Sequence, residues 1–291
     1  MTDSDQVPTI VMTGATAGLG RATVMALGRR GANLVLLARN TDAARLVAIE
    51  AAQTGAPNIE VIECDLGRMS SVRRAAAELI ARVGTIDALV HVAAVVTPTR
   101  AVTAEGNEMM LATNYLGPWL LTNLLIGSQL GDSGLRLISV GGPLDAKPDL
   151  ADLDSEHEFS FMKTFERTKT ALNLFTAAAP RHCAADLRAV IYSPGLMKTG
   201  LSATVAKAMA RPVGTLAGRL LPDPDGSAEG LADLILSTDL KNVAPGTLFD
   251  RHGKASPMPL LDDVSLQDAL WGLTSQLLAT SVLVTCPAPG E

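Results

Sequence analysis

Thr13-Gly14-Ala15-Thr16-Ala17-Gly18-Leu19-Gly20 lies near the start of this 291-residue chain, between an apolar stretch and a segment with a helical pattern. Gly14 would allow a tight turn, Gly18 would let the backbone approach a pyrophosphate, and Gly20 would allow close packing of helix and strand. The helix N-terminus would offer free N–H groups and the positive end of its dipole to phosphates. Three glycines alone are a weak signal, but their position between strand and helix predicts a dinucleotide-binding loop. The residues expected to contact the dinucleotide here are Gly14, Thr16, Gly18, Leu19 and Gly20.

Outward from this loop, short β-branched runs alternate with longer amphipathic stretches, which is typical of a parallel sheet with crossover helices. Leu34-Val35-Leu36-Leu37 is apolar throughout, as expected of a strand that is covered on both faces. Strands are predicted near 8–13, 33–38, 58–63, 86–93, 134–140 and 186–192, and helices near 18–30, 41–54, 68–83, 105–130, 160–182 and 264–281. The pattern indicates an α/β protein with a Rossmann-type doubly wound parallel sheet, as a single domain over residues 1–291.

The pattern loosens over residues 196–225, directly after the last predicted strand. This segment is apolar and rich in small residues until Pro222-Asp223-Pro224-Asp225-Gly226 interrupts it. Ligands bind at the carboxyl edge of such sheets, so we predict a substrate lid here, with an ordinary pair of surface helices as the alternative. The Met, Leu and Ala content favours an apolar or polycyclic ligand.

Composition excludes several classes of protein. The formal net charge is −6 without a long basic run, so nucleic acid is not an expected partner. No apolar run is long enough to span a bilayer, the first residues do not resemble a signal peptide, and the three cysteines are widely spaced. The four histidines show no metal-ligand spacing, and no nucleophile-elbow motif is present. We therefore expect a cytoplasmic protein that binds no metal and no membrane.

The second and third predicted strands end in residues that bear on the adenosine half of a dinucleotide. Arg39 follows the second strand, where an arginine accommodates a 2′-phosphate and an acidic residue binds a free 2′-hydroxyl. Arg39 therefore favours NADP(H), unless it is only a solvated charge. Asp65 and Leu66 follow the third strand, and Asp65 would either accept a hydrogen bond from the adenine amino group or cap the next helix.

Further motifs make the chain resemble the short-chain dehydrogenase/reductase family, and most closely its branch of retinol dehydrogenases. The matching segments are Asn114–Thr122, Asp152–Glu156, Pro194–Thr199, Gly246–Asp250 and Leu266–Leu278. The resemblance implies that Asn114 is the active-site Asn and that Lys169 binds the nicotinamide ribose. It also implies that Pro194, Gly195 and Thr199 contact the nicotinamide end. The helices at 105–130 and 160–182 pair subunits in this family, which implies a homodimer or homotetramer.

The chain departs from the family pattern where the family handles protons. The family's Tyr-x-x-x-Lys is Phe165-Glu166-Arg167-Thr168-Lys169 here, so Phe165 stands at the tyrosine position. Gly142 stands at the position of the family's serine, and His91-Val92-Ala93-Ala94 replaces its Asn-Asn-Ala-Gly. A histidine that ends an apolar strand is usually a buried core residue, and we interpret His91 in that way.

Loss of a positioned acid typically costs ~10²–10⁴-fold in rate, and loss of an oxyanion donor ~10²–10³-fold. Lys169 and Asn114 remain, so the sequence keeps the binding residues and lacks the usual proton donor. Thr168 and Tyr192 are the candidate substitutes that we carry forward, beside Glu166 and His157.

Three hypotheses fit this pattern. The main one is a divergent NADP(H)-dependent oxidoreductase that acts on a hydrophobic small molecule, with hydride supplied by the cofactor. The first alternative is a non-redox enzyme (cyclase, isomerase or lyase) in secondary metabolism, because a fold does not fix a chemistry. The second is an inactive NADP(H)-binding regulatory protein.

Overall fold

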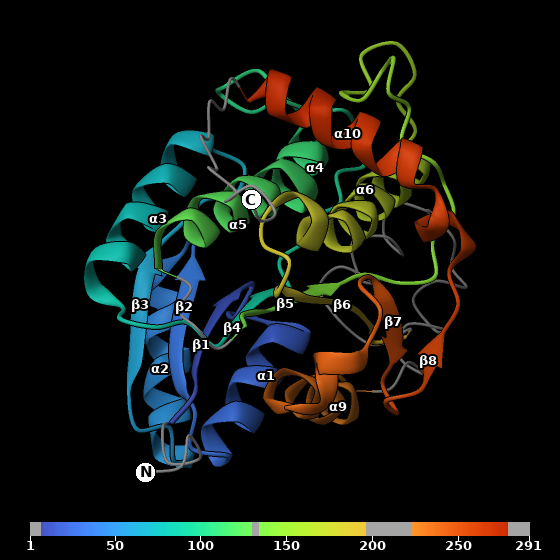
Figure 1. Ribbon diagram of the computed structural model, residues 1–291. Helices are drawn as coiled ribbons and strands as arrows, with labels where there is room; N and C mark the ends of the chain where they lie inside the picture. Colours follow the sequence, from blue (N-terminus) through green and yellow to red (C-terminus); the bar gives the residue numbers. More distant parts are fainter. Residues whose placement is uncertain (1–6, 130–133, 196–222, 279–291) are drawn as a thin grey trace.

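The computed structural model describes residues 7–129, 134–195 and 223–278, and its strands form a single sheet (Figure 1). The strands are β1 (Thr9–Thr13), β2 (Asn33–Ala38), β3 (Ile59–Glu63), β4 (Ala88–His91), β5 (Arg136–Val140), β6 (Arg188–Ser193), β7 (Thr247–Asp250) and β8 (Ala255–Ser256). Their order is β3-β2-β1-β4-β5-β6-β7-β8, with every pair parallel except β7 and β8. The predicted Rossmann-type doubly wound sheet is confirmed.

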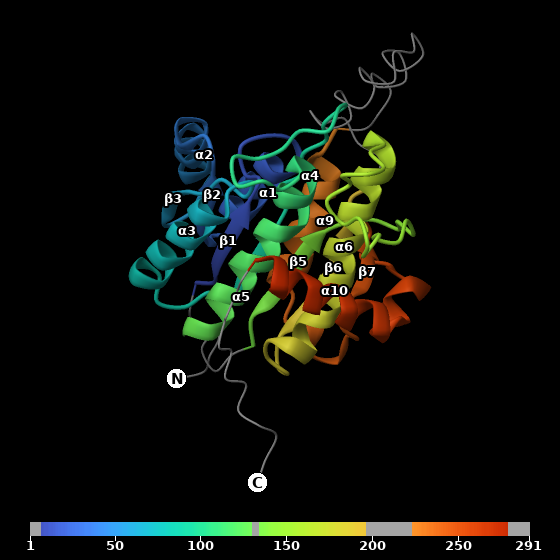
Figure 2. The same cartoon turned by 90° about the horizontal axis from the view of Figure 1, so that it is seen from above.

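Helices cover both faces of the sheet (Figures 1 and 2). One face carries α1 (Gly18–Arg29), α2 (Thr41–Thr54) and α9 (Asp225–Leu236). The other face carries α3 (Met69–Arg82), α4 (Met109–Leu111), the π-helix η1 (Ala112–Leu116), α5 (Gly117–Gln129) and α6 (Phe161–His182), with α10 (Val264–Leu277) packed on α6. Two 3₁₀ turns, η2 (Asp239–Asn242) and η3 (Pro259–Asp262), complete the described elements.

Several predicted boundaries were wrong. The helix predicted at 105–130 begins only at Met109, because Gly106 has a φ of +90° and Glu108 accepts from the backbone N–H of Leu111 as the N-cap. β7 and β8 were not predicted because they have four and two residues and are too short to show a period, and the helix α9 was also not predicted. The predicted lid, apart from residues 223–225, and residues 279–281 of the last helix lie outside the described residues.

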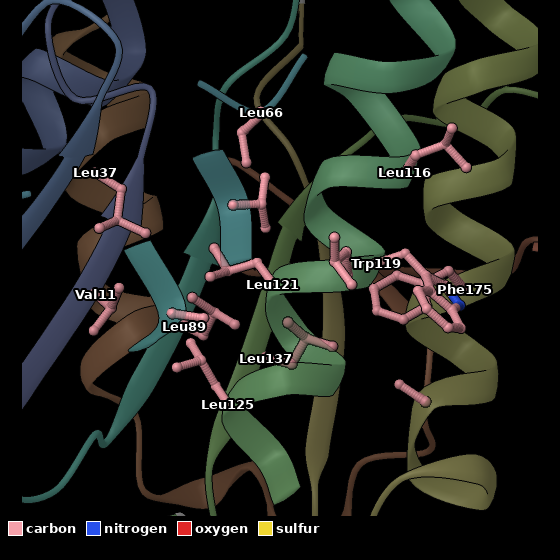
Figure 3. Close-up of a cluster of buried hydrophobic side chains, with 14 of the residues drawn as sticks. Val11, Leu37, Leu66, Leu89, Leu116, Trp119, Leu121, Leu125, Leu137 and Phe175 are labelled. Atoms are coloured by element: carbon pink, nitrogen blue, oxygen red, sulfur yellow. The ribbon is translucent and has the colours of Figure 1, made fainter. Parts of the chain in front are cut away.

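The core consists of two apolar layers, one on each face of the sheet. Figure 3 shows the layer in which strand residues such as Leu89 and Leu137 meet Trp119 of α5 and Phe175 of α6. The next residue along β4, Val90, packs on the opposite face in the layer of α1 and α9. Each fully buried large side chain stabilises the fold by about 1.5–3 kcal/mol. The strands are apolar at successive residues because both of their faces are buried.

α10 lies over α5 and α6 on the side away from the sheet (Figure 1). Trp271 of α10 stacks on His182 with ring centroids 4.4 Å apart, and lies 5.7 Å from Phe175 and 5.3 Å from Trp119. The predicted homodimer or homotetramer remains a prediction.

No helix in the three described segments is both long and apolar enough to cross a lipid bilayer.

Candidate functional site

The strand order reverses between β1 and β4, which are adjacent at the centre of the sheet. Thr13 at the end of β1 lies beside His91 at the end of β4, and His91 lies beside Ser139 of β5. In open α/β sheets, a crevice forms outside the carboxyl ends of the strands at such a reversal, and ligands bind there. The candidate site is therefore built from the loops that follow β1, β4 and β5.

In the glycine-rich loop after β1, backbone atoms lie too close together to leave room for a side chain. A Cβ added to Gly14 would lie 2.5 Å from the backbone nitrogen of Ala93, and Gly14 has a φ of +73°. A Cβ added to Gly20 would lie 2.0 Å from the carbonyl oxygen of Gly14. Gly18, where α1 begins, has a φ of +52°. A residue with a side chain therefore could not replace Gly14 or Gly20 unless the backbone moved.

The N-terminus of α1 is free to bind an anion. Its N-cap residue, Ala17, makes no side-chain cap, and the first turn holds no acidic residue. The N–H groups of this turn and the helix dipole therefore lack a partner from the described chain. Thr16 is half-buried beside this turn and Leu19 is buried under it, so the five predicted loop residues lie together.

The predicted adenosine-binding residues lie at the ends of β2 and β3. Arg39 is exposed directly after β2, and Asn40 caps α2 by accepting from the N–H of Ala43. Asp65 accepts from the N–H of Gly67 at 3.0 Å, within the loop before α3, and Leu66 is buried.

Asp65 does not cap α3, because the carboxylate of Glu105 accepts from the first N–H groups of that helix. Of the two roles considered for Asp65, helix capping is therefore the one that the structure does not support.

Lys169 lies on the inner face of α6 and is 5% exposed. Its Nζ donates to the carbonyl oxygen of Val140, the last residue of β5. Burial lowers the pKa of Lys169 to about 8, because a low-dielectric environment disfavours the charged ammonium. The side chain predicted to bind ribose therefore lies at the end of the strand next to β4.

His91 is buried on the same face of the sheet, and its two ring nitrogens differ. Its Nε2 lies 2.8 Å from the hydroxyl oxygen of Thr122, whose own proton goes to the carbonyl oxygen of Pro118. Nε2 is therefore the donor, and Nδ1 is an acceptor without a partner among the described residues. Burial, and then the charge of Lys169, lower the pKa of His91 to about 3. His91 is a neutral core residue with one unsatisfied nitrogen.

Asn114 is fully engaged in holding the loop after β4. Its side-chain oxygen accepts from the N–H of Val95 at 2.8 Å, and its Nδ2 donates to the carbonyl oxygen of Val95 and to the hydroxyl of Thr168. The hydroxyl of Thr168 in turn donates to the carbonyl oxygen of Phe165 at 2.8 Å. Thr168 is therefore committed to structure, and its proton is not free for a substrate.

Gly142 and Phe165 differ in how deeply they are buried. Gly142 is buried, and among the described residues a Cβ added to it would meet one atom within 4 Å, in Leu144 at 3.9 Å. A Cβ added to Gly141 would lie 2.1 Å from Oδ1 of Asn173. Phe165 is half-buried, one helical turn before Lys169. Gly142 therefore lies two residues after the strand end to which Lys169 is bonded, and Phe165 precedes Lys169 by one helical turn.

Tyr192 lies on the opposite face of the sheet from Lys169. It pairs with Val140 across β5 and β6, its ring packs in the layer of α1 and α9, and its hydroxyl donates to the carbonyl oxygen of Ser227 at 2.6 Å. The structure does not bring Tyr192 to the site.

Pro194 and Gly195 follow β6 at the carboxyl edge, with Gly195 at a φ of +72°, and Thr199 lies outside the described residues. His157 is exposed and Glu166 is half-buried.

The sequence analysis missed Asn173 as a residue of the site. Asn173 is buried, and its Nδ2 donates to the carbonyl oxygen of Gly142 at 3.0 Å, which fixes the strand end beside Lys169. One signal was present: Asn173 follows Lys169 by four residues and so shares its helix face.

Fold and site together define a Rossmann-type α/β protein with a glycine-rich loop and an uncapped helix N-terminus at the switch point of its sheet. The sequence profile of the family described as "short chain dehydrogenase" matches residues 8–146. A polyprenol dehydrogenase of Mus musculus is 30% identical, over 90% of this chain and 81% of its own. The chain belongs to the short-chain dehydrogenase/reductase family.

Other relatives extend this result. Retinol dehydrogenase 13 of Mus musculus is 26% identical over 97% of this chain and 87% of its own. A protein of Streptomyces sp. strain C5, named as a daunorubicin C-13 ketoreductase, is 32% identical over 66% of each chain.

Among solved structures, a protein of Mycobacterium paratuberculosis has a TM-score of 0.72 and 28% identity, covering 96% of this chain and 98% of its own. Actinorhodin polyketide ketoreductase with NADPH shares the fold at a TM-score of 0.62 and 19% identity, covering 86% of this chain and 97% of its own.

Proposed function

We propose that this protein is an NADP(H)-dependent oxidoreductase that reduces or oxidises a hydrophobic small molecule without the usual Ser/Tyr pair. The observation that carries the proposal is the glycine loop at the switch point, where Gly20 packs against the carbonyl of Gly14 below an uncapped helix N-terminus. Membership of the family supports the redox class.

The residues present fit a dinucleotide. The space that a Cβ at Gly14 or Gly20 would fill is taken by backbone, so the loop stays tight enough for pyrophosphate at the N–H groups of α1. Arg39 would hold a 2′-phosphate, and Lys169 would bind the nicotinamide ribose. When bound, the nicotinamide supplies or accepts hydride.

The substrate class follows from the relatives and from the site. The similar proteins are named for retinol and polyprenol, which are both largely apolar, and for the C-13 position of daunorubicin. Phe165 adds an aromatic ring where the family has a hydroxyl, and Gly142 carries no side chain where the family has a serine. These features favour a bulky apolar substrate, and the ketoreductase relative makes secondary metabolism the setting that we propose.

Calorimetric titration with NADPH, NADP⁺, NADH and NAD⁺ tests the cofactor assignment. We expect micromolar binding of NADP(H), and Arg39→Ala should weaken it toward the level of NAD(H) by removing the phosphate partner. Arg45→Ala, at an exposed arginine of α2, is the matched control and should bind like the unmodified chain. Absence of binding by all four dinucleotides would refute the proposal.

The loop itself can be tested by one methyl group. Gly20→Ala places a Cβ 2.0 Å from the Gly14 carbonyl, so the loop must shift, and we expect dinucleotide binding to fall below detection. Gly84→Ala, at a glycine with no atom within 4 Å of the added Cβ, should leave the affinity unchanged. Equal affinities in the two variants would show that the loop is not the binding site.

The missing hydroxyls also favour a second candidate, a non-redox enzyme (cyclase, isomerase or lyase) that positions a reactive substrate beside the bound nucleotide. Phe165 would then be a wall of the pocket. Substrate turnover without a change in NADPH absorbance would support this candidate. Tight dinucleotide binding without any turnover would instead support a regulatory protein.

A further inference from the structure

Arg167 of α6 carries a buried donor that the described residues leave without a partner. Its side chain is 15% exposed, and its Nη1 is buried and makes no hydrogen bond within the described part of the chain. Its Nη2 lies 3.7 Å from Oδ2 of Asp149, which allows an ion pair but is too long for a hydrogen bond. Buried polar groups in native proteins are nearly always bonded to protein or to ordered water. Nη1 of Arg167 therefore needs a partner.

A small cavity adjoins this guanidinium. It lies between α4, α6 and the segment 148–155, and its volume of about 10 Å³ is close to that needed by one water molecule. Several buried polar atoms lack a partner among the described residues, including the hydroxyls of Thr97 and Thr170, but of these only Nη1 belongs to a residue that lines the cavity. The polar residues of the lining are Asp149, Asp152, Ser155, Thr164, Arg167 and Thr168.

Hydrogen bonds fix both walls of the cavity. On α6, Thr164 lies one turn before Thr168 on the same helix face, and its hydroxyl donates to Oγ of Ser155 at 3.4 Å. On the opposite wall, Ser155 has a φ of +50°, which is uncommon for a residue with a side chain. Its carbonyl oxygen accepts from Nε of Arg100 at 3.0 Å. The carboxylate of Asp152 accepts from the backbone N–H groups of residues 156–158, so this wall is also held from within.

The chemistry of the lining selects water as the occupant. Nη1 of Arg167 is a free donor, and the hydroxyl of Ser155, which accepts from Thr164, has its own proton left to donate. A water can accept both bonds and donate two of its own, for which the carboxylates of Asp149 and Asp152 offer acceptors. These carboxylates disfavour an anion and the guanidinium disfavours a cation. The volume excludes an organic molecule.

We propose that this cavity binds one ordered water molecule, which accepts a hydrogen bond from Nη1 of Arg167 and joins the segment 148–155 to α6. Thr168 also lines the cavity, and its hydroxyl accepts from Asn114 at 3.1 Å. The water therefore supports the turn of α6 that fixes Asn114 and the loop after β4. The inference goes beyond the proposed oxidoreductase function and does not rest on it, because no residue of the glycine-rich loop lines the cavity.

A crystal structure of the unmodified protein tests the site directly. We expect one density peak in the cavity, within about 3.2 Å of Nη1 of Arg167. An empty cavity, or a direct hydrogen bond from Nη1 to a protein oxygen, would overturn the inference. A crystal soaked in bromide distinguishes water from an anion, and an anomalous peak at this position would also overturn it.

Oxygen-17 relaxation dispersion counts long-lived internal waters in solution. Arg167→Met removes the donor, so we expect it to lose one such water relative to the unmodified protein. It should also speed amide exchange at Ser155, whose N–H donates to the Asp152 carbonyl, by about 10-fold, the effect of roughly one hydrogen bond. Arg45→Met, at an exposed arginine of α2, should change neither quantity. An unchanged water count in Arg167→Met would contradict the inference.

Asp149→Asn separates the water from the ion pair. It removes the negative charge near Nη2 but keeps a side-chain oxygen as acceptor, so we expect the water and the slow exchange at Ser155 to persist. Equal acceleration of exchange by Asp149→Asn and Arg167→Met would show that the ion pair holds the segment, against the inference. The crystal structure decides the question even if Arg167→Met fails to fold, and none of these outcomes bears on dinucleotide binding.

Discussion

Replacement of Lys169 by methionine should remove a pH-dependent contribution to stability. The pKa of this side chain is lowered from 10.5 to about 8 by burial, which corresponds to about 3 kcal/mol at about 1.4 kcal/mol per pKa unit. Between these two values the unfolded chain binds more protons than the folded one, so the free energy of unfolding rises with pH. Below pH 8 the folded state carries the full cost of the buried ammonium.

The measurement is urea unfolding at pH values from 7.5 to 10, for the unmodified protein and for Lys169→Met. The buried thiol of Cys64, whose pKa is raised to about 12 by burial, acts in the opposite direction above pH 9. Because Cys64 is present in both proteins, its effect cancels in the difference between their free energies of unfolding. That difference should shift in favour of the lysine protein by about 2–3 kcal/mol across the range.

Lys163→Met is the matched control, since Lys163 is exposed on the same helix, and its difference from the unmodified protein should not vary with pH in this way. A difference between unmodified protein and Lys169→Met that stays constant from pH 7.5 to 10 would refute the account of Lys169 as a buried, uncompensated ammonium.

The remaining predictions concern the neighbours of this lysine. The pKa of His91 is lowered from 6.5 to about 3, so its folded state resists protonation and stability should fall by about 3 kcal/mol between pH 7 and pH 4. His91→Asn should abolish that part of the acid sensitivity, whereas exposed His157→Asn should not, as urea unfolding would show. Gly142→Ser should change the free energy of unfolding by less than about 1 kcal/mol, because a Cβ there would meet only one atom of the described residues within 4 Å, in Leu144 at 3.9 Å. Gly141→Ser should cost about 2 kcal/mol or more, because its Cβ would lie 2.1 Å from a buried amide oxygen of α6, and equal thermal melting of the two variants would contradict this. Gly142→Ser combined with Phe165→Tyr should raise the rate of phenanthrenequinone reduction by NADPH by ~10²-fold. An unchanged rate would show that the two positions do not face the substrate.

The sequence was sufficient for the class of fold and for the position of the glycine-rich loop between β1 and α1. The apolar strands and the spacing of Gly14, Gly18 and Gly20 are local patterns, and they hold because a parallel sheet covered on both faces admits few alternatives. The sequence also predicts that Phe165 and Gly142 are departures from the family motif, and this stays a prediction. It failed for β7 and β8, which are short strands that pair with their neighbours in the sheet, and for α9, which packs on α1.

The side-chain relations in the site depended on tertiary structure. Tyr192 and Lys169 both lie near the carboxyl edge in sequence terms, yet they occupy opposite faces of the sheet, because Tyr192 shares the face of its partner Val140. Likewise, the hydrogen bond of Lys169 and the commitment of Thr168 depend on contacts between strands and helices that are distant in sequence. Local patterns determine which elements form and which faces they bury. Which buried polar groups find partners is decided only when those faces meet.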